Sequence, residues 1–241
     1  MPFRDIVGHR HLLDLLSAAA VRGSLPPSLI FAGPEGVGKR MAALALAQVF
    51  NCSAVDPQTN DSCGRCAACT RIARGVHADV LTIEPGDTGA IKVEQIREVL
   101  QRSAYRPFEG RRRAVIIDDA DAALVEAQNA MLKTLEEPPA ASTFVLVTSR
   151  PDVLLPTVRS RCQRLRFGRL APAEVAGVLI RTHGYAEADA HAAASLSDGS
   201  IGLALEGGSD DYVEARDAAS RLLKGVAGGT DPRARLASAQ A

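Results

Sequence analysis

The strongest constraint on the fold of this chain is a glycine-rich segment that lies between two apolar runs. The segment has the pattern Gly33-x4-Gly38-Lys39, with Gly36 inside it; residues 28–32 precede it and an alanine- and leucine-rich run over 41–50 follows. The first run predicts a buried strand and the second a helix. Glycines at this junction let backbone N–H groups close around phosphate oxygens, while the helix N-terminus and the lysine supply positive charge. We therefore predict a phosphate-binding loop.

The rest of the chain alternates in the same way up to about residue 168. Further strands are expected at 79–84, 114–117, 144–147 and 163–167, and helices at 9–22, around 93–100, at 126–137 and at 153–160. Such alternation predicts an α/β fold with a parallel sheet and crossover helices. Beyond that point only helical patterns follow, so we expect an α/β domain over 1–168 and a small all-α domain over 169–241. The polar last ten residues suggest that the chain stops before a further domain.

Composition excludes several classes of function. Lys plus Arg and Asp plus Glu both number 28, so the net charge is zero and a globally basic nucleic-acid binder is disfavoured. Hydrophobic residues make up 46% of the chain, which is enough for a folded core. No apolar run reaches the length of about 18 residues that a membrane span needs, and the N-terminus lacks a signal peptide pattern. We expect a cytoplasmic protein without membrane contact, whose cysteines are thiols or metal ligands.

Two positions argue against efficient ATP hydrolysis. A phosphate-binding loop places Ser or Thr after its lysine to bind Mg²⁺, but here Arg40 follows Lys39. The pair Asp118-Asp119 ends a predicted strand, where a metal-binding Asp and a catalytic Glu are expected. Asp118 could hold Mg²⁺ through water, whereas Asp119 is one methylene shorter than Glu. Two carboxylates that merely end a strand are the alternative, and binding of ATP or ADP without hydrolysis stays open.

Four cysteines lie close together in a polar, turn-rich stretch over 51–70. The spacing Cys52-x10-Cys63-x2-Cys66-x2-Cys69 suits a tetrahedral four-thiolate Zn²⁺ site of structural type, since no coordination position is left open. Unrelated reduced thiols, a redox pair and an iron–sulfur cluster are the alternatives. Cys162 is remote in sequence and is left out of the predicted site.

A dense basic stretch includes the triplet Ser160-Arg161-Cys162. One interpretation is a solvated basic surface. The other is that Arg161 reaches the nucleotide of a neighbouring subunit, because a fixed guanidinium can stabilise charge on a transferring γ-phosphate in trans.

Several motifs together resemble bacterial clamp loaders, which are AAA+ proteins of the DNA polymerase III holoenzyme. They are Phe3-x-x-Ile6-Val7-Gly8, the phosphate loop, the cysteine cluster, Asn129-Ala-Met-Leu-Lys-Thr-Leu-Glu-Glu-Pro-Pro139 and Ser160-Arg161-Cys162, in the order seen in that family. The resemblance covers residues 1–168 strongly and the remainder weakly. It implies an AAA+ core with a parallel sheet and an inserted zinc-binding loop, followed by a helical lid domain.

Two kinds of family member compete for this chain. Motor subunits (gamma/tau) have an intact phosphate loop and an Asp-Glu pair, whereas delta-prime subunits have degraded ones and do not hydrolyse ATP. This chain departs from the motor pattern at Arg40, Asp119 and Gly202. At the position of Gly202 the motor has a nucleotide-sensing Arg. Thr148, in contrast, matches the motor's polar sensor. The resemblance thus implies a degenerate nucleotide pocket formed by Val7, Gly8, Gly33, Gly36, Gly38, Lys39, Arg40, Asp118, Asp119 and Thr148.

The departures favour a delta-prime-like role. The resemblance then implies a non-hydrolysing stator of the polymerase III clamp loader that presents Arg161 in trans to the ATP site of the adjacent motor subunit. Its partners would be gamma/tau and delta subunits, the sliding clamp indirectly, and primed DNA in the assembled complex. We expect the family's C-terminal collar domain to be missing from this chain. A hydrolysing motor subunit is the main alternative, and a zinc-dependent nucleic-acid module is the second.

Overall fold

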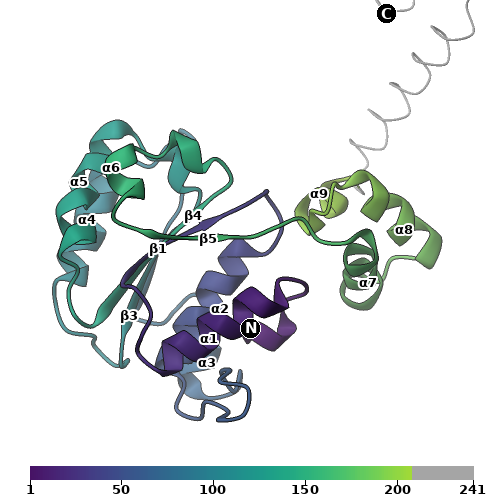
Figure 1. The fold of residues 1–241 in the computed structure, drawn as a ribbon, viewed down its shortest axis with the longest axis horizontal. Coiled ribbons are helices and arrows are strands. Elements are labelled where there is room, and N and C mark those ends of the chain that lie inside the picture. Colours follow the sequence, from purple (N-terminus) through teal and green to yellow (C-terminus); the bar gives the residue numbers. More distant parts are fainter. Residues whose placement is uncertain (208–241) are drawn as a thin grey trace, which may run out of the picture.

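The computed structural model describes residues 1–207, and within them five parallel strands form one sheet (Figure 1). The order across the sheet is β2-β3-β4-β1-β5. The strands are β1 (Ser28–Ala32), β2 (Val80–Ile83), β3 (Arg113–Ile117), β4 (Ser142–Thr148) and β5 (Gln163–Arg166). The predicted α/β class with a parallel sheet is confirmed.

Every residue of the three central strands, β1, β3 and β4, is buried. The middle of each strand is an apolar run, because helices cover both faces of the sheet. On one face, side chains such as Phe31 and Val145 pack with α1 (Arg10–Val21) and α2 (Lys39–Asn51). On the other face, α4 (Val93–Ser103), α5 (Val125–Glu136) and α6 (Pro156–Arg159) bury their apolar sides. Short 3-10 turns lie at Phe3–Asp5, Ala120–Ala122 and Pro151–Val153.

Two local elements differ from the sequence-based expectation. The cysteine stretch contains a helix, α3 (Ala67–Ala73), whose alanines favour helix despite the short length. The helix expected over 153–160 is broken, because Leu154 is extended and Pro156 starts α6 anew.

Three helices follow β5 in the described part of the chain: α7 (Pro172–His183), α8 (Glu187–Leu196) and α9 (Ile201–Glu206). They share a small core of their own, which includes Leu170, Val175 and Ala190. Figure 1 shows these helices beside the α/β part, beyond the carboxyl end of β5. The domain boundary near residue 168 stays a prediction. The part of the predicted helical domain beyond residue 207, with the expectation for the last ten residues, lies outside the described residues.

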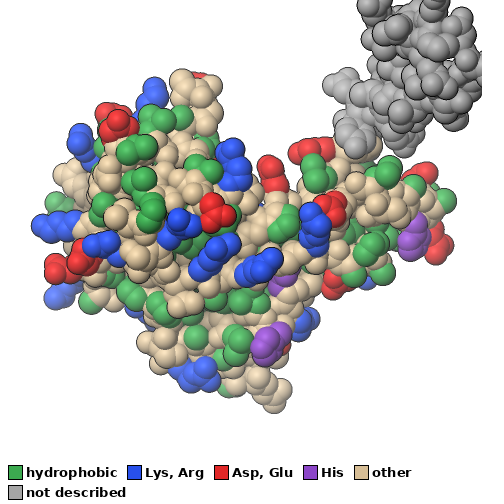
Figure 2. Space-filling view, turned by 45° about the horizontal axis from the view of Figure 1, so that its top comes forward, with side chains coloured by type: hydrophobic (Ala, Val, Ile, Leu, Met, Phe, Trp, Pro, Cys, Tyr) green, Lys and Arg blue, Asp and Glu red, His purple; other side chains and the backbone are tan. Residues whose placement is uncertain are grey.

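Because all five strands are parallel, their carboxyl ends lie along one edge of the sheet and their amino ends along the other. The segments after β1, β3 and β4 therefore meet at one edge, where ligands of open parallel sheets bind. Basic and acidic side chains lie among one another on the face shown in Figure 2. No helix among residues 1–207 is both long enough and apolar enough to cross a membrane.

Candidate functional site

The phosphate loop joins the carboxyl end of β1 to the first turn of α2. Gly36 and Gly38 have φ angles of +69° and +97°, the left-handed region that glycine adopts without strain. The Lys39 Nζ donates hydrogen bonds to the carbonyls of Gly33 at 2.8 Å and Pro34 at 2.5 Å. The glycine conformations therefore let the backbone carbonyls of the loop approach the ammonium group of Lys39.

Carboxylates surround Lys39. Burial lowers the pKa of its ammonium, and the negative charges of Asp119, Glu35, Asp118 and Asp121 oppose that change only in part. The buried lysine thus lies where sequence analysis placed the phosphate contact, within a cluster of acids at the carboxyl edge of the sheet.

Arg40 crosses from the first turn of α2 to the ends of β2 and β3. Its Nε lies 3.3 Å from Asp118 Oδ2, and its Nη2 forms an ion pair with Glu84 Oε1. Burial and the neighbouring Asp119 raise the pKa of Asp118, and the Arg40 charge counteracts them. Asp119 itself has a left-handed backbone, with φ +47°. Glu84 was missed by sequence analysis, because only the register of β2 beside β3 brings it here.

The side chain of the predicted polar sensor, Thr148, donates to an acid, while its backbone carbonyl accepts from the N–H of Gly33 in the phosphate loop at 3.2 Å. Its Oγ1 donates to Asp121 Oδ1 at 2.6 Å, and Arg150 Nε donates to Asp121 Oδ2 at 2.8 Å. Burial raises the pKa of Asp121, but these two bonds outweigh burial and lower it overall. Asp121 was also missed; a third carboxylate just after Asp118-Asp119 was the available signal.

The helices after β5 contact the phosphate loop directly. The carbonyl of Gly36 accepts hydrogen bonds from the backbone N–H groups of Ile201 at 3.1 Å and Gly202 at 3.3 Å. A Cβ on Gly36 would lie 2.2 Å from Ser200 Oγ. Gly202 thus lies against the loop at the position where motors, by resemblance, have a sensing arginine.

The first predicted pocket segment lies on the same side of the fold. Val7 and Gly8 are half-buried, and a Cβ on Gly8 would lie 2.2 Å from Leu170 Cδ2. The next residue, His9, donates from Nε2 to the Val37 carbonyl at 3.1 Å. The structure therefore gathers all ten predicted pocket residues around the carboxyl edge, although Thr148 and Arg40 face protein carboxylates.

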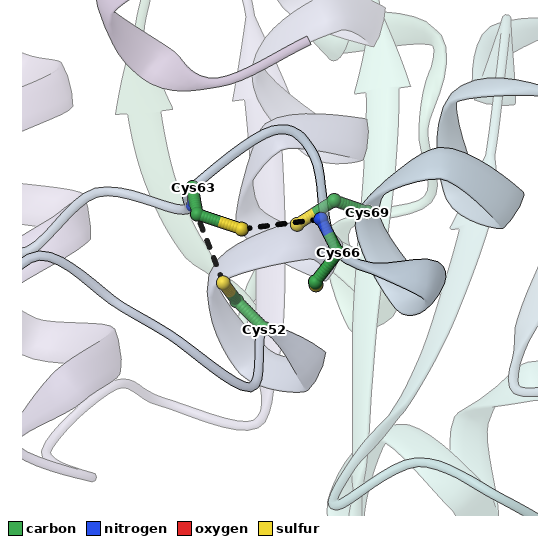
Figure 3. A group of neighbouring side chains, drawn as sticks. All are labelled: Cys52, Cys63, Cys66 and Cys69. Atoms are coloured by element: carbon green, nitrogen blue, oxygen red, sulfur yellow. Dashed lines mark hydrogen bonds between the residues drawn. The ribbon is translucent and has the colours of Figure 1, made fainter.

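The four predicted zinc ligands converge (Figure 3). The Sγ atoms of Cys52, Cys63, Cys66 and Cys69 all lie within 4.8 Å of one another. Four sulfurs around a zinc ion lie roughly 3.8 Å apart, as Zn–S bonds of about 2.3 Å in a tetrahedron require, so the donor set fits zinc. Burial raises the pKa of Cys66, but N–H donors from Cys69 and Ser53 outweigh it and lower that pKa to about 6.

Polar contacts anchor this cysteine cluster to the α/β part. Asp61 Oδ1 accepts from the Phe3 N–H at 3.0 Å, and its Oδ2 accepts from the Arg4 N–H at 3.0 Å. Gln48 on α2 donates to the Cys69 carbonyl at 2.9 Å and accepts from Ser62 Oγ. The loop therefore has a fixed place beside α1 and α2, on the face of the sheet opposite α5.

Arg161 lies at the other edge of the sheet, two residues before β5. Its Nε and Nη2 both donate to Glu136 Oε2, at 3.1 and 2.9 Å, and Nη1 donates to the Thr157 carbonyl. Gln163 pairs beside Leu29, at the amino end of β1. The five residues of β1 separate the two edges by roughly 16 Å. Arg161 therefore lies away from the phosphate loop of its own chain.

Sequence and structure comparisons place these features in a known family. The family model described as DNA polymerase III, delta subunit, matches residues 8–171. The DNA polymerase III tau subunit of Bacillus subtilis is 34% identical over 73% of this chain and 30% of that protein. The tau subunit of Escherichia coli is 36% identical over 70% of this chain and 26% of that protein. The chain thus spans about a third or less of the length of these two relatives.

Solved structures agree on the fold. A DNA polymerase III gamma subunit-related protein of Thermotoga maritima has a TM-score of 0.53 at 23% identity, covering 89% of this chain and 66% of that one. The RuvB Holliday junction branch migration motor of the same organism has a TM-score of 0.56 at 17% identity, covering 99% and 70%. With an AAA+ fold and a family match over more than half its length, this chain belongs to the DNA polymerase III delta-subunit family of clamp-loader proteins.

Proposed function

We propose that this chain is a non-hydrolysing stator of the DNA polymerase III clamp loader. It presents Arg161 in trans to the ATP site of an adjacent gamma/tau-type motor subunit, in a cytoplasmic complex that also contains delta. The complex places the sliding clamp on primed DNA. The observation that carries this proposal is the position of Arg161 at the amino edge of the sheet, opposite its own phosphate loop.

An arginine at that edge is suited to act on a neighbour. Fixed guanidinium groups stabilise the charge that develops on the γ-phosphate during transfer, and they are commonly supplied in trans. Arg161 is partly exposed and is oriented by one carboxylate and one carbonyl. Its partner Glu136 ends α5, whose Leu135 carbonyl accepts from Ser28 at the start of β1. Both residues therefore lie on the surface that faces away from the chain's own loop.

The chain's own pocket supports the non-hydrolysing part of the proposal. Arg40 pairs with the carboxylate that would hold Mg²⁺, and Asp119 is one methylene shorter than the catalytic Glu expected at its position. ATP or ADP can still be bound by Lys39 and the loop. The cysteine cluster is proposed to hold a structural Zn²⁺ ion.

A hydrolysing motor subunit is the second candidate. Its support is that the relatives compared above are tau subunits and that Lys39, Asp118 and Thr148 are all retained.

The deciding experiment measures clamp- and DNA-stimulated ATP turnover by the reconstituted ring. The full-length protein is supplied as wild type, Arg161→Ala or Lys39→Ala, with Arg159→Ala as the matched control because Arg159 pairs only with Asp152 among the salt bridges of the described residues. Arg161→Ala should slow turnover at the adjacent site on the order of 10³-fold. Lys39→Ala and Arg159→Ala should leave it unchanged. Loss with Lys39→Ala would favour the motor, and no effect of Arg161→Ala would exclude the trans role.

A further inference from the structure

The place of the divalent cation in this phosphate loop is filled by a side chain. In a complete loop, a hydroxyl after the lysine and a carboxylate after a neighbouring strand hold Mg²⁺ beside the β- and γ-phosphates. Here the guanidinium of Arg40 replaces the hydroxyl and pairs with Asp118 at 3.3 Å and with Glu84. The residues present therefore do not fit a magnesium ion, because a fixed positive charge already engages the carboxylates that would bind it.

The same guanidinium reduces the negative charge that would face a bound nucleotide. Without a cation, Asp118 and Glu84 would repel the phosphates of a nucleotide in the loop. Arg40 neutralises part of this charge and has further N–H donors, since a guanidinium offers five. Planar, multidentate pairing with phosphate is characteristic of arginine. Together with Lys39, it gives the loop two fixed positive charges at the first turn of α2.

We infer that Arg40 substitutes for Mg²⁺, so that the loop binds a nucleoside di- or triphosphate without a divalent cation. This inference rests on the proposed function, since it concerns the loop that the proposal treats as non-hydrolysing. Such a nucleotide would be a structural ligand: the metal that polarises the γ-phosphate for transfer is missing, while the positive charge that retains the phosphates is present.

The test is calorimetric titration of the purified chain with ADP and with a non-hydrolysable ATP analogue. The metal-free buffer is prepared on a chelating resin, because a soluble chelator would also strip metal from the cysteine cluster. A second buffer contains excess MgCl₂. The wild-type Kd should differ by less than about threefold between the two buffers. Lys39→Ala should abolish binding in both, which assigns the signal to the loop.

Arg40→Thr restores the hydroxyl and removes the charge. It should weaken binding at least about tenfold in metal-free buffer and regain affinity with Mg²⁺, whereas Arg97→Thr, on the exposed side of α4, should match wild type. If Arg40→Thr does not fold, the wild-type pair of titrations decides alone. Wild-type binding that tightens tenfold or more with Mg²⁺, or no saturable binding in either buffer, overturns the inference. Neither result affects the ring assay of Arg161, so the two proposals can fail separately.

Discussion

Asp79 is a fully buried carboxylate that organises the segment between α4 and β3. It accepts hydrogen bonds from the N–H groups of Phe108, Glu109 and Gly110 and from Arg113 Nη2, at 2.7 to 2.9 Å. Burial raises the pKa of Asp79, but these donors outweigh burial and lower it to about 2. Asn51 also accepts from the N–H groups of Arg111 and Arg112, so buried side chains replace regular secondary structure in holding this segment.

Removing that charge should destabilise the protein strongly. Asp79→Asn leaves Arg113 buried without its partner, and we expect a loss of about 3–5 kcal/mol in the free energy of unfolding. Because the pKa of Asp79 is lower in the folded state than in the unfolded state, its contribution is present above about pH 4 and is lost as the pH falls toward 2. Urea unfolding at several pH values measures both effects. Asp87→Asn, at an exposed position, is the control. An equal loss of unfolding free energy in that variant would contradict the stabilising role assigned to Asp79.

Glu136 holds Arg161 through a pair that is partly exposed on both sides. Such a pair stabilises a fold by no more than about 1 kcal/mol, so Glu136→Gln should leave the melting temperature nearly unchanged. We expect it to lower ring turnover by severalfold, less than Arg161→Ala does, because the arginine loses its orientation and keeps its charge. Glu137→Gln, at the next exposed position, should have no effect. Unchanged turnover in Glu136→Gln would show that the carboxylate does not position the arginine.

At the scale of elements, the cysteine cluster combines the end of α2, the N-terminus of α3 and the loop between them. Metal analysis of protein purified without chelator should give about one Zn per chain. Cys66→Ser should lose the metal and expose 51–70 to proteolysis, since a small polar loop depends on ligation for its stability. Cys162→Ser should retain the metal, because that thiol lies in the core under α5. Wild-type protein without metal would contradict the zinc assignment.

The sequence predicted those elements whose signals are local. Apolar runs indicated the three central strands, alternation of apolar and polar residues indicated β2, the glycine pattern located the turn into α2, and cysteine spacing located the cluster. The sequence did not predict which side chains pair in the site. Glu84 reaches Arg40, Asp121 reaches Thr148 and Glu136 reaches Arg161. Each pair depends on the register of strands or on the end of a distant helix. The position of α9 on the phosphate loop was missed for the same reason.

At the scale of the whole molecule, Gly36 lies where the phosphate loop contacts the helices after β5. Gly36→Ala should destabilise the protein by about 2 kcal/mol for two reasons. The new Cβ would collide with Ser200 and Gly202, and alanine is strained in the left-handed conformation of this position. Gly184 has a similar φ of +70°, but a Cβ added there would have no atom within 4 Å. Gly184→Ala should therefore lower the free energy of unfolding by only about 1 kcal/mol. Thermal unfolding compares the two variants. Equal losses would mean that the contact between α9 and the loop contributes nothing.

The carboxyl and amino edges of the sheet also differ in the groups that they present to neighbouring subunits. One edge carries the phosphate loop and the other carries Arg161. Under the proposed function, this arrangement lets each member of a ring of such subunits complete the site of the next. Under the proposed function, this member acts on one neighbour and requires no arginine from the other. Among subunits arranged in an open arc, it could therefore occupy an end of the row without leaving any active site incomplete. Asymmetry of this kind sets where in the assembly a gap can form without a loss of catalysis.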